Sequence, residues 1–230
     1  MYDGRTKPLK CDLRKFVFDD FNQEQFDGVF AGTNESYHEI WWFYCSKNST
    51  TSDRYVVYNY LEQVWYYGTM ARTAWLDSGL RNNPLAATYS YNLVNHEQGV
   101  DDNETASTAA IPAYVTSAQF DLDDGHQFAF ISKILPDMRF DDSESGAPSA
   151  TMTLLPLTDS GAGYTSPASV GGSNSATITR SAVLPIEQYT DQIFTRVRGR
   201  QMSIKVESTD IGVTWQLGTP RIDMRADGRR

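Results

Sequence analysis

The chain has 230 residues, of which 40% are hydrophobic and 13% aromatic, so it can build one large or two small packed domains and is not disordered as a whole. Its formal net charge of -9 argues against a protein that grips nucleic acid through phosphates, because that affinity comes from lysine and arginine. We expect no membrane span, because the sequence lacks a run of about 18 apolar residues, and no secretory signal, because its first residues lack an apolar stretch.

Cysteine and histidine are sparse. Cys11 and Cys45 are too few for a disulfide framework and are not paired at the close spacing of a zinc site, so we expect plain thiols. The three histidines, His38, His96 and His126, are widely spaced. The sequence therefore predicts no metal site and no cofactor.

Short strands are the expected elements of the N-terminal part. Aromatic and β-branched runs such as EIWWFY and RYVVYNY alternate with polar turn clusters, which is typical of an antiparallel meander. The interval 69–84 has room for one or two helical turns before Asn82, Asn83 and Pro84 stop them. Strands are expected at residues 12–18, 25–31, 38–44, 54–60, 63–68 and 86–94.

The strand expected at 54–60 has large side chains on both of its faces. Tyr55 and Val57 point to one side and Val56 and Tyr58 to the other, because side chains alternate along a strand. This pattern predicts a central strand that is covered on both sides.

The second part of the chain has the sequence pattern of a β-sandwich. Asp123, Asp124 and Gly125 form a turn signal from which the chain is expected to return as a strand, and 186–191 has the composition of a short helical turn. Strands are expected at 114–122, 128–135, 151–157, 176–183, 200–208, 212–218 and 220–230.

These elements predict an all-β fold, a propeller-like antiparallel meander followed by a β-sandwich-like region. The expected domains are a propeller-blade-like meander at 1–95, an acidic polar loop at 96–112, and a sandwich-like region at 113–230 with a Gly/Ser-rich loop at 158–175. One or two blades cannot close a propeller ring. Either the chain belongs to a larger whole, or another subunit supplies the neighbouring strands.

Paired acids are the most frequent candidates for chemistry. They could flank a sugar bond in a glycosidase, but we expect turn chemistry at each, since aspartate bends and caps the backbone. Asp121 to Gly125 superficially resembles a calcium loop, but the ligands that an EF-hand needs further on are missing, which leaves an incidental calcium site as the alternative. The pairs are Asp19-Asp20, Asp101-Asp102, Asp123-Asp124 and Asp141-Asp142.

Motifs of enzymes are missing from the sequence. It has no GxSxG nucleophile elbow and no phosphate-binding glycine motif. His96 and Glu97 are a neighbouring histidine–acid pair, which we interpret as a solvated pair in a loop. We therefore expect no catalytic residues and no enzymatic activity.

Aromatic and basic residues are the remaining candidates. At strand spacing, tryptophans are more often packing anchors or interface residues than an exposed sugar-stacking platform. Arginines near the C-terminus stand out in an acidic chain and are candidates for pairing between subunits, with contact to nucleic acid or a plain solvated segment as alternatives. The packing and interface candidates are Trp41, Trp42, Trp65, Trp75, Arg196, Arg198 and Arg200.

Three segments resemble one protein family. They are the EIWWFY/RYVVYNY hairpin, the segment Arg72–Trp75, and the terminal pattern RGRQM…W.LG..R.D.R.DGRR. Together they are similar to the C-terminal region of the tail-hub or nozzle proteins of short-tailed bacteriophages, the tail tubular protein B-like or packaged-DNA-stabilisation-like class. The resemblance spans most of the chain.

This resemblance implies an all-β structural component of the virion tail, made in the host cytoplasm. Such proteins form a ring, usually hexameric, beneath the portal and adaptor, and the ring retains packaged DNA and becomes its exit channel. The implied partners are other copies of the chain, the portal and adaptor, further tail proteins, and DNA that passes through the lumen without specific binding. No catalytic residue is implied. The chain is short for the class, so a C-terminal fragment or a split tail protein is expected.

Two other functions fit the same features. The tryptophans and tyrosines, together with the paired acids, are also typical of a carbohydrate-binding or carbohydrate-cleaving β-protein, such as a host-surface adhesin. An isolated β-sandwich that acts as an interaction module is the third hypothesis.

Overall fold

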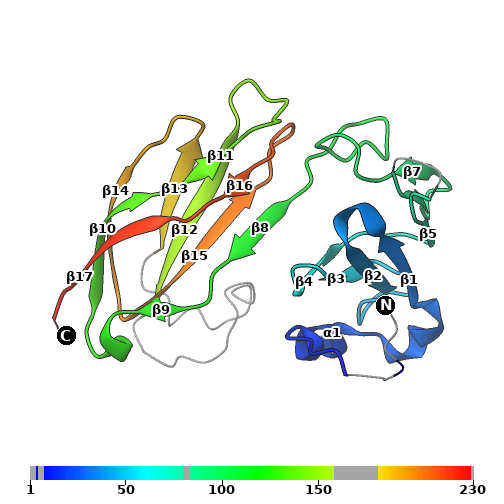
Figure 1. Ribbon diagram of the computed structural model, residues 1–230, viewed down its shortest axis with the longest axis horizontal. Coiled ribbons are helices and arrows are strands. Elements are labelled where there is room, and N and C mark those ends of the chain that lie inside the picture. The colour runs from blue at the N-terminus through cyan, green and yellow to red at the C-terminus, as the bar shows by residue number, and fades with distance from the viewer. Residues whose placement is uncertain (1–3, 5–7, 80–82, 158–180, 229–230) are drawn as a thin grey trace. The chain divides into compact units, whose positions relative to one another are not determined.

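The structure is a computed structural model that describes residues 4, 8–79, 83–157 and 181–228. The chain forms two compact units, Met1–Gly99 and Val100–Arg230, and the boundary falls inside the acidic segment 96–112. Antiparallel sheets dominate both units (Figure 1), so the predicted all-β class is confirmed. The propeller-like arrangement stays a prediction. No helix in the described part of the chain is long and apolar enough to cross a membrane.

The main sheet of unit 1 is a four-stranded antiparallel meander. Its strands follow chain order, β1 (Phe30–Asn34), β2 (Glu39–Tyr44), β3 (Arg54–Asn59) and β4 (Val64–Thr69). The alternation of aromatic and β-branched residues thus predicted β2, β3 and β4 correctly. Because β3 lies between β2 and β4 and both of its valines are buried, the prediction of a covered central strand is confirmed.

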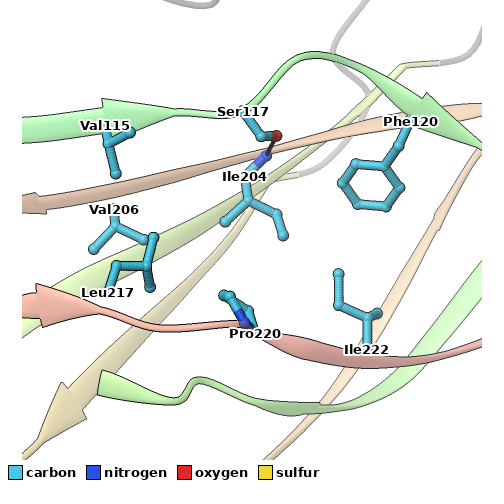
Figure 2. A pocket seen from close by; sticks show the side chains of 8 residues that line it. All are labelled: Val115, Ser117, Phe120, Ile204, Val206, Leu217, Pro220 and Ile222. Atoms are coloured by element: carbon cyan, nitrogen blue, oxygen red, sulfur yellow. Dashed lines mark hydrogen bonds between the residues drawn. The ribbon is translucent and has the colours of Figure 1, made fainter. Parts of the chain in front are cut away.

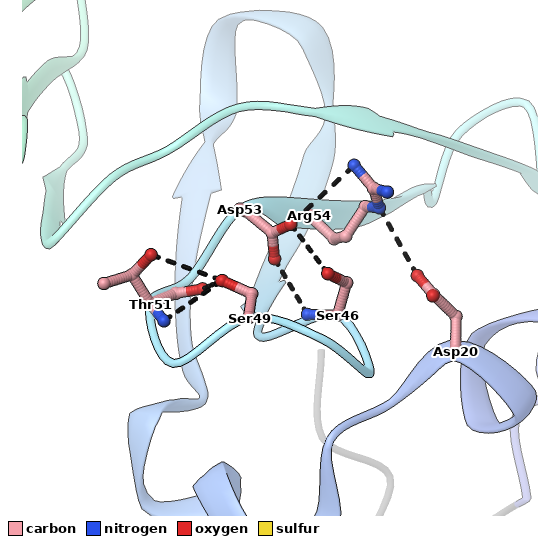
Figure 3. Close-up of polar contacts among 6 residues, drawn as sticks. All are labelled: Asp20, Ser46, Ser49, Thr51, Asp53 and Arg54. Atoms are coloured by element: carbon pink, nitrogen blue, oxygen red, sulfur yellow. Dashed lines mark hydrogen bonds and ion pairs between the residues drawn. The ribbon is translucent and has the colours of Figure 1, made fainter.

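Polar contacts fix the turn between β2 and β3 (Figure 3). The carboxylate of Asp53 accepts hydrogen bonds from the backbone N–H of Ser46 at 2.8 Å and from its hydroxyl at 2.7 Å. Arg54 forms an ion pair with Asp20 at 3.3 Å, which ties the start of β3 to the helix α1 (Arg14–Asp20). In the polar turn between the two aromatic strands, side chains therefore act as hydrogen-bond partners for the backbone.

The strand predicted at 12–18 is wrong, because this segment forms the short helix α1. Its alternating apolar residues could fit either element over so few positions. Packing decides in favour of the helix, since Phe16 lies against Tyr67 of β4 with ring centroids 4.3 Å apart. The pair Asp19-Asp20 consequently lies in the last turn of a helix and not in the turn that the sequence predicted.

The strand predicted at 25–31 is wrong in its first half. This half forms the 3-10 helix η1 (Gln23–Gly28), and β1 begins only at Phe30. The side chain of Asn22 caps η1 by accepting the N–H of Glu24 at 3.0 Å, a local bond that competes with strand pairing. A second 3-10 turn, η2 (Glu35–Tyr37), connects β1 to β2.

Unit 1 contains a second sheet. One of its strands lies in 69–84, where helical turns were expected, and two others lie in 85–95, where a single strand was expected at 86–94. The division occurs at a turn in which Thr88 Oγ1 accepts the N–H of Asn92 at 3.2 Å and Tyr91 adopts a left-handed φ of 64°. The sheet consists of β5 (Ala74–Leu76), β6 (Leu85–Ala87) and β7 (Leu93–Asn95).

Unit 2 contains two larger sheets whose inner faces share one core, as in a β-sandwich. One sheet has the order β13-β12-β15-β8, with β9 also paired to β15, and the other has the order β14-β10-β17. Buried aliphatic residues from both sheets, among them Ile131, Met152, Ile186 and Val206, form a single cluster. The strands, including the short pair β11-β16, are β8 (Ala113–Thr116), β9 (Phe120–Asp121), β10 (Ala129–Leu135), β11 (Met138–Arg139), β12 (Ser149–Leu157), β13 (Ala182–Glu187), β14 (Ile193–Gly199), β15 (Gln201–Ser208), β16 (Gln216–Leu217) and β17 (Arg221–Ala226).

Several local expectations for unit 2 are wrong. The strand expected at 114–122 is interrupted at Ser117, and the following turn is the 3-10 helix η3 (Asp123–Gly125). The chain does not return as a hairpin there, because β9 pairs with β15 while β10 pairs with β14 and β17. The helical turn expected at 186–191 is absent, since β13 continues to its last residue Glu187 and Thr190 then closes a turn onto it.

Two expectations fall partly or wholly outside the described residues. The Gly/Ser-rich loop at 158–175 lies outside them, as does most of the strand expected at 176–183.

At the C-terminal end, the strand expected at 212–218 is reduced to the two residues of β16, and β17 occupies the middle of the segment 220–230.

Candidate functional site

The inner aromatic cluster of unit 1 is formed around Trp41, which is only 6% exposed. Its ring stacks on Trp75 with centroids 5.2 Å apart and contacts Phe43 at 5.9 Å and Tyr55 at 4.7 Å. Trp75 is fixed in turn by a hydrogen bond from its Nε1 to the carbonyl of Thr33 at 2.8 Å. Strands β1, β2, β3 and β5 thus meet at two of the predicted tryptophans.

The other two predicted tryptophans form an outer stack on the opposite face of the same sheet. Trp42 and Trp65 are half-buried, and their rings stack at 5.7 Å, with Tyr58 4.7 Å from Trp65. The indole N–H of Trp65 donates to the carbonyl of Lys10 at 2.9 Å. The four residues therefore belong to two separate stacks, because neighbouring positions in a strand point to opposite faces.

Gly32 of β1 allows Trp75 to approach the sheet. A Cβ atom at this position would overlap the indole ring of Trp75. We expect Gly32→Ala to lower the free energy of unfolding of unit 1 by about 1–3 kcal/mol, because the ring must move in a packed cluster. Urea unfolding followed by tryptophan fluorescence measures this effect.

Gly28→Ala is the matched control for this prediction. A Cβ at Gly28 meets only the sulfur of Cys45, at the ordinary contact distance of 3.4 Å. The control is expected to change stability by less than about 0.5 kcal/mol. Equal effects of the two substitutions would contradict the role assigned to the contact between Gly32 and Trp75.

A buried polar network lies beside the inner cluster. Glu39, which is 8% exposed, accepts hydrogen bonds from Trp41 Nε1 at 3.0 Å, from Asn34 Nδ2 at 3.4 Å and from the hydroxyl of Tyr66. Burial, followed by the hydrogen bond to Glu39, raises the pKa of the Tyr66 hydroxyl, which keeps it a donor. Three donors from β1, β2 and β4 therefore compensate a carboxylate that would be costly to bury alone.

A second carboxylate joins this network from the end of unit 1. Asn34 Nδ2 also donates to Glu97 Oε1 at 3.1 Å, so that one amide connects two acids. Loss of hydration at the carboxyl end, and then the charge of Glu39, raise the pKa of Glu97, although much of the residue is exposed. The neighbouring His96 accepts a hydrogen bond from Arg72 Nε at 3.0 Å. The pair lies in a loop and Glu97 is exposed, as expected, but His96 is half-buried with a partner in unit 1, so the interpretation as a solvated pair is wrong for His96.

The raised pKa of Glu97 gives stability a defined dependence on pH. The folded state binds this proton more tightly than the unfolded state, so its contribution is complete below the ordinary pKa of 4.5 and is lost as the pH rises through the raised value. Glu97→Gln removes the titrating group. We expect this variant to gain stability relative to the wild type as the pH rises through that interval.

Urea unfolding of both proteins at a series of pH values from 4.5 upward measures this difference. Comparison with the wild type cancels the contributions of carboxylates that do not interact with Glu97. A difference in stability that stays constant over the whole series would contradict the assignment.

The predicted arginines lie at one end of the β14-β10-β17 sheet. Arg198 pairs with Asp227 at 2.6 Å and lies over the ring of Phe128 at 3.9 Å. Arg200 lies over the same ring at 4.8 Å, and its guanidinium donates to a backbone carbonyl of η3 at 3.2 Å. Arg196 is exposed on β14. Two of the three predicted residues thus already have contacts within unit 2.

Strand pairing places further cations and aromatic residues beside these arginines, and we call the resulting surface the basic face. Phe130 of β10 lies opposite Arg198 of β14 on one side and opposite Arg225 of β17 on the other, and Arg225 lies over its ring at 4.8 Å. The three strands contribute five cations and one carboxylate, all on the face that points away from the core. The basic face also includes Asp227, which pairs with Arg198, and it consists of Phe128, Phe130, Lys133, Phe194, Arg196, Arg198, Arg221, Asp223, Arg225 and Asp227.

Unit 2 also contains an apolar cavity of about 320 Å³ that the sequence did not reveal (Figure 2). It lies between the edge of the β8-β15 pair and β17, where the two sheets of the sandwich separate. Ser117 is its polar residue, and the hydroxyl accepts the N–H of Ile204 at 3.0 Å. The lining residues are Val115, Ser117, Phe120, Ile204, Val206, Leu217, Pro220 and Ile222.

Metal and acid chemistry have little support in the described segments. Within the described ranges, no group of three or more histidine, cysteine, aspartate or glutamate side chains is arranged to hold a metal ion. Of the acid pairs in unit 2, Asp123-Asp124 lies within η3, Asp141-Asp142 in a turn, and Asp101-Asp102 in a bend next to the bridge between Asp102 and Ala109. Asp123 and Asp142 adopt left-handed φ values of 56° and 66°. The absence of cofactors stays a prediction.

Comparisons with known proteins leave the family open. No protein-family model matches the chain, and a search of the curated proteins finds no significant match. The comparisons therefore do not identify a phage tail protein. The resemblance of the hairpin and of the terminal segment to nozzle proteins stays a hypothesis.

Proposed function

We propose that the chain is a structural subunit of a bacteriophage tail, part of a nozzle or hub ring that retains packaged DNA and forms its exit channel. The observation that carries this proposal is the contact between two of the segments that resemble nozzle proteins. Trp75 of the segment Arg72–Trp75 stacks on Trp41 of the β2–β3 hairpin at 5.2 Å. Segments far apart in the sequence thus build one packed module, which supports a shared structural motif.

The distribution of charge also supports this proposal. A net charge of -9 suits the wall of a channel through which DNA must slide, because like charges do not adhere. The basic face is the exception, and an exposed face of arginine and phenylalanine is typical of a surface that a protein partner covers. Copies of the chain, the portal and adaptor, and further tail proteins are the proposed partners.

The composition of purified virions tests this function. In particles of the phage that carries the gene, we expect mass spectrometry to find the chain in tails in stoichiometric amounts with the other ring components. Particles assembled without the chain are expected to lose their packaged DNA. Purified tails that lack the chain, with DNA retention unchanged, would overturn the proposal.

A carbohydrate-binding protein or host-surface adhesin is the alternative. The half-buried outer stack of Trp42 and Trp65 favours it, because part of both rings remains accessible on the sheet. A glycan array on the wild type and on Trp42→Ala distinguishes the two functions. Binding that the substitution abolishes without unfolding the protein would favour the alternative.

A further inference from the structure

Three loops lie together at one end of the sandwich in unit 2 (Figure 1). The two carboxylate oxygens of Asp101 accept the N–H of Gly212, each at 2.9 Å, and the carbonyl of Gly212 accepts the N–H of Glu144 at 2.9 Å. The loops 101–110, 141–147 and 209–214 are thereby joined. We call them the acidic loop end.

The acidic loop end has the opposite character to the basic face. Its three loops contain seven carboxylates and no lysine or arginine, and every residue in them is described. One of the seven, Asp141, forms an ion pair at 2.7 Å with Arg139 of the adjoining strand β11, which leaves an excess of negative charge. Ile211 lies among these carboxylates and is 55% exposed. The carboxylates are Asp101, Asp102, Glu104, Asp141, Asp142, Glu144 and Asp210.

We propose that the basic face of one copy binds the acidic loop end of a neighbouring copy. This inference rests on the proposed ring, since it names the surfaces that would join its subunits. The charges are complementary, which steers two copies together and fixes their orientation. An exposed apolar residue stands on each surface, Phe194 at 73% exposure and Ile211 at 55%, so that contact also removes apolar area from water.

The geometry of the two surfaces sets the symmetry of the assembly. The basic face and the acidic loop end are different parts of the same unit, so each copy offers one of each. Such a head-to-tail contact leaves a free surface at both ends of a dimer, and it continues into a ring where the rotation between copies closes and into an open filament where it does not.

Nucleic acid is the competing partner for the basic face. Phosphates would satisfy the arginines, but they would leave the acidic loop end and Ile211 uncovered. The overall charge of -9 also repels a polyanion. A second copy therefore accounts for both surfaces at once.

Charge reversal on each surface tests the inference. The first variant is Arg196→Glu with Arg225→Glu, and the second is Asp141→Lys with Glu144→Lys. We expect each variant alone to associate about tenfold or more weakly than the wild type in sedimentation velocity, because like charges then meet in the contact. A mixture of the two is expected to associate again, because the new glutamates of the first variant face the new lysines of the second, and the two unaltered surfaces still complement each other.

Lys15→Glu with Lys47→Glu is the control, because it changes the net charge as the first variant does but at exposed positions in unit 1. The control is expected to associate like the wild type. The inference is overturned if the wild type stays monomeric, if the reversed variants associate normally, or if the mixture forms no dimer. Fluorescence anisotropy with single- and double-stranded DNA is the additional measurement, and loss of DNA binding in the first variant with normal self-association would assign the face to nucleic acid.

These outcomes are separate from those for the proposed function. If the chain occurs in tails but its charge-reversed variants still form rings, the proposed function stands and only the proposed contact is wrong. If the chain associates through these surfaces but is missing from purified tails, the proposed contact stands and the proposed function is wrong.

Discussion

Trp41→Ala is expected to lower the free energy of unfolding of unit 1 by about 3–5 kcal/mol. Trp41 is the centre of the inner cluster, where its ring contacts Trp75, Phe43 and Tyr55 and its N–H reaches Glu39. The alanine variant leaves a large cavity and one fewer donor for a buried carboxylate. Urea unfolding followed by near-UV circular dichroism measures the loss.

The neighbouring Trp42→Ala is the matched control. Trp42 has the same size and lies in the same strand, but it is half-buried in the outer stack. We expect a cost of about 1–2 kcal/mol, since less apolar area returns to water. Equal losses for the two variants would contradict the division into an inner cluster and an outer stack.

Glu39→Ala is expected to cost about 2–4 kcal/mol, because it leaves buried donors without an acceptor. The hydroxyl of Tyr66, the indole N–H of Trp41 and the amide of Asn34 all point to this carboxylate. Removing one partner from a buried network costs the desolvation of the groups that remain. Equilibrium unfolding of the purified variant gives the value.

Glu39→Gln is the comparison that separates the network from simple packing. Glutamine fills the same volume and keeps one acceptor oxygen, but it replaces the other by an amide donor. We expect an intermediate loss, and Glu39→Gln combined with Tyr66→Phe is expected to cost less than the two single losses added together. Strict additivity would contradict direct coupling between Glu39 and Tyr66.

Strands whose sequence pattern is long and regular were predictable. The β2–β3 hairpin follows from alternating aromatic and β-branched residues on either side of a polar turn, and β10, β12 and β15 follow from the same kind of pattern. The central position of β3 followed from large side chains on both faces. In each case a local pattern of at least six residues agrees with the final packing.

Short segments were not predictable, because the local pattern fits more than one element. The helix α1 was expected as a strand, but the N–H of Val17 donates to the carbonyl of Leu13 as in a helix, and Phe16 contacts Tyr67 of β4. The division between β6 and β7 depends on a hydrogen bond that the N–H of Asn92 donates to Thr88 Oγ1 and on a left-handed residue, Tyr91, for which the sequence offered no glycine as a signal.

The candidate surfaces were predictable only in part. The sequence singled out Arg196, Arg198 and Arg200, but the position of Arg198 and Arg225 on either side of Phe130 requires the register of three strands that are distant in sequence. Proximity of the acidic loops likewise depends on long-range bonds such as that between the Asp101 carboxylate and Gly212. An alternating pattern of arginine and apolar residues in β14 and β17 was the available signal for the basic face.

The Glu39 network had an even weaker signal. Glutamate at the start of an aromatic strand is ordinarily expected at the surface, and Glu97 follows it only after a long interval of chain. The tyrosine and indole donors that make the burial tolerable come from other positions of the meander. Contacts of this kind emerge only once the strands are paired.

The mass of the purified wild-type chain tests the central claim, assembly as a tail ring subunit, most directly. Multi-angle light scattering of the chain alone and with a portal–adaptor complex, with negative-stain images of the same fractions, is the measurement. The account predicts closed rings with a mass several times that of one chain. A compact particle with the mass of a single chain, both alone and in the presence of the portal and adaptor, would contradict it.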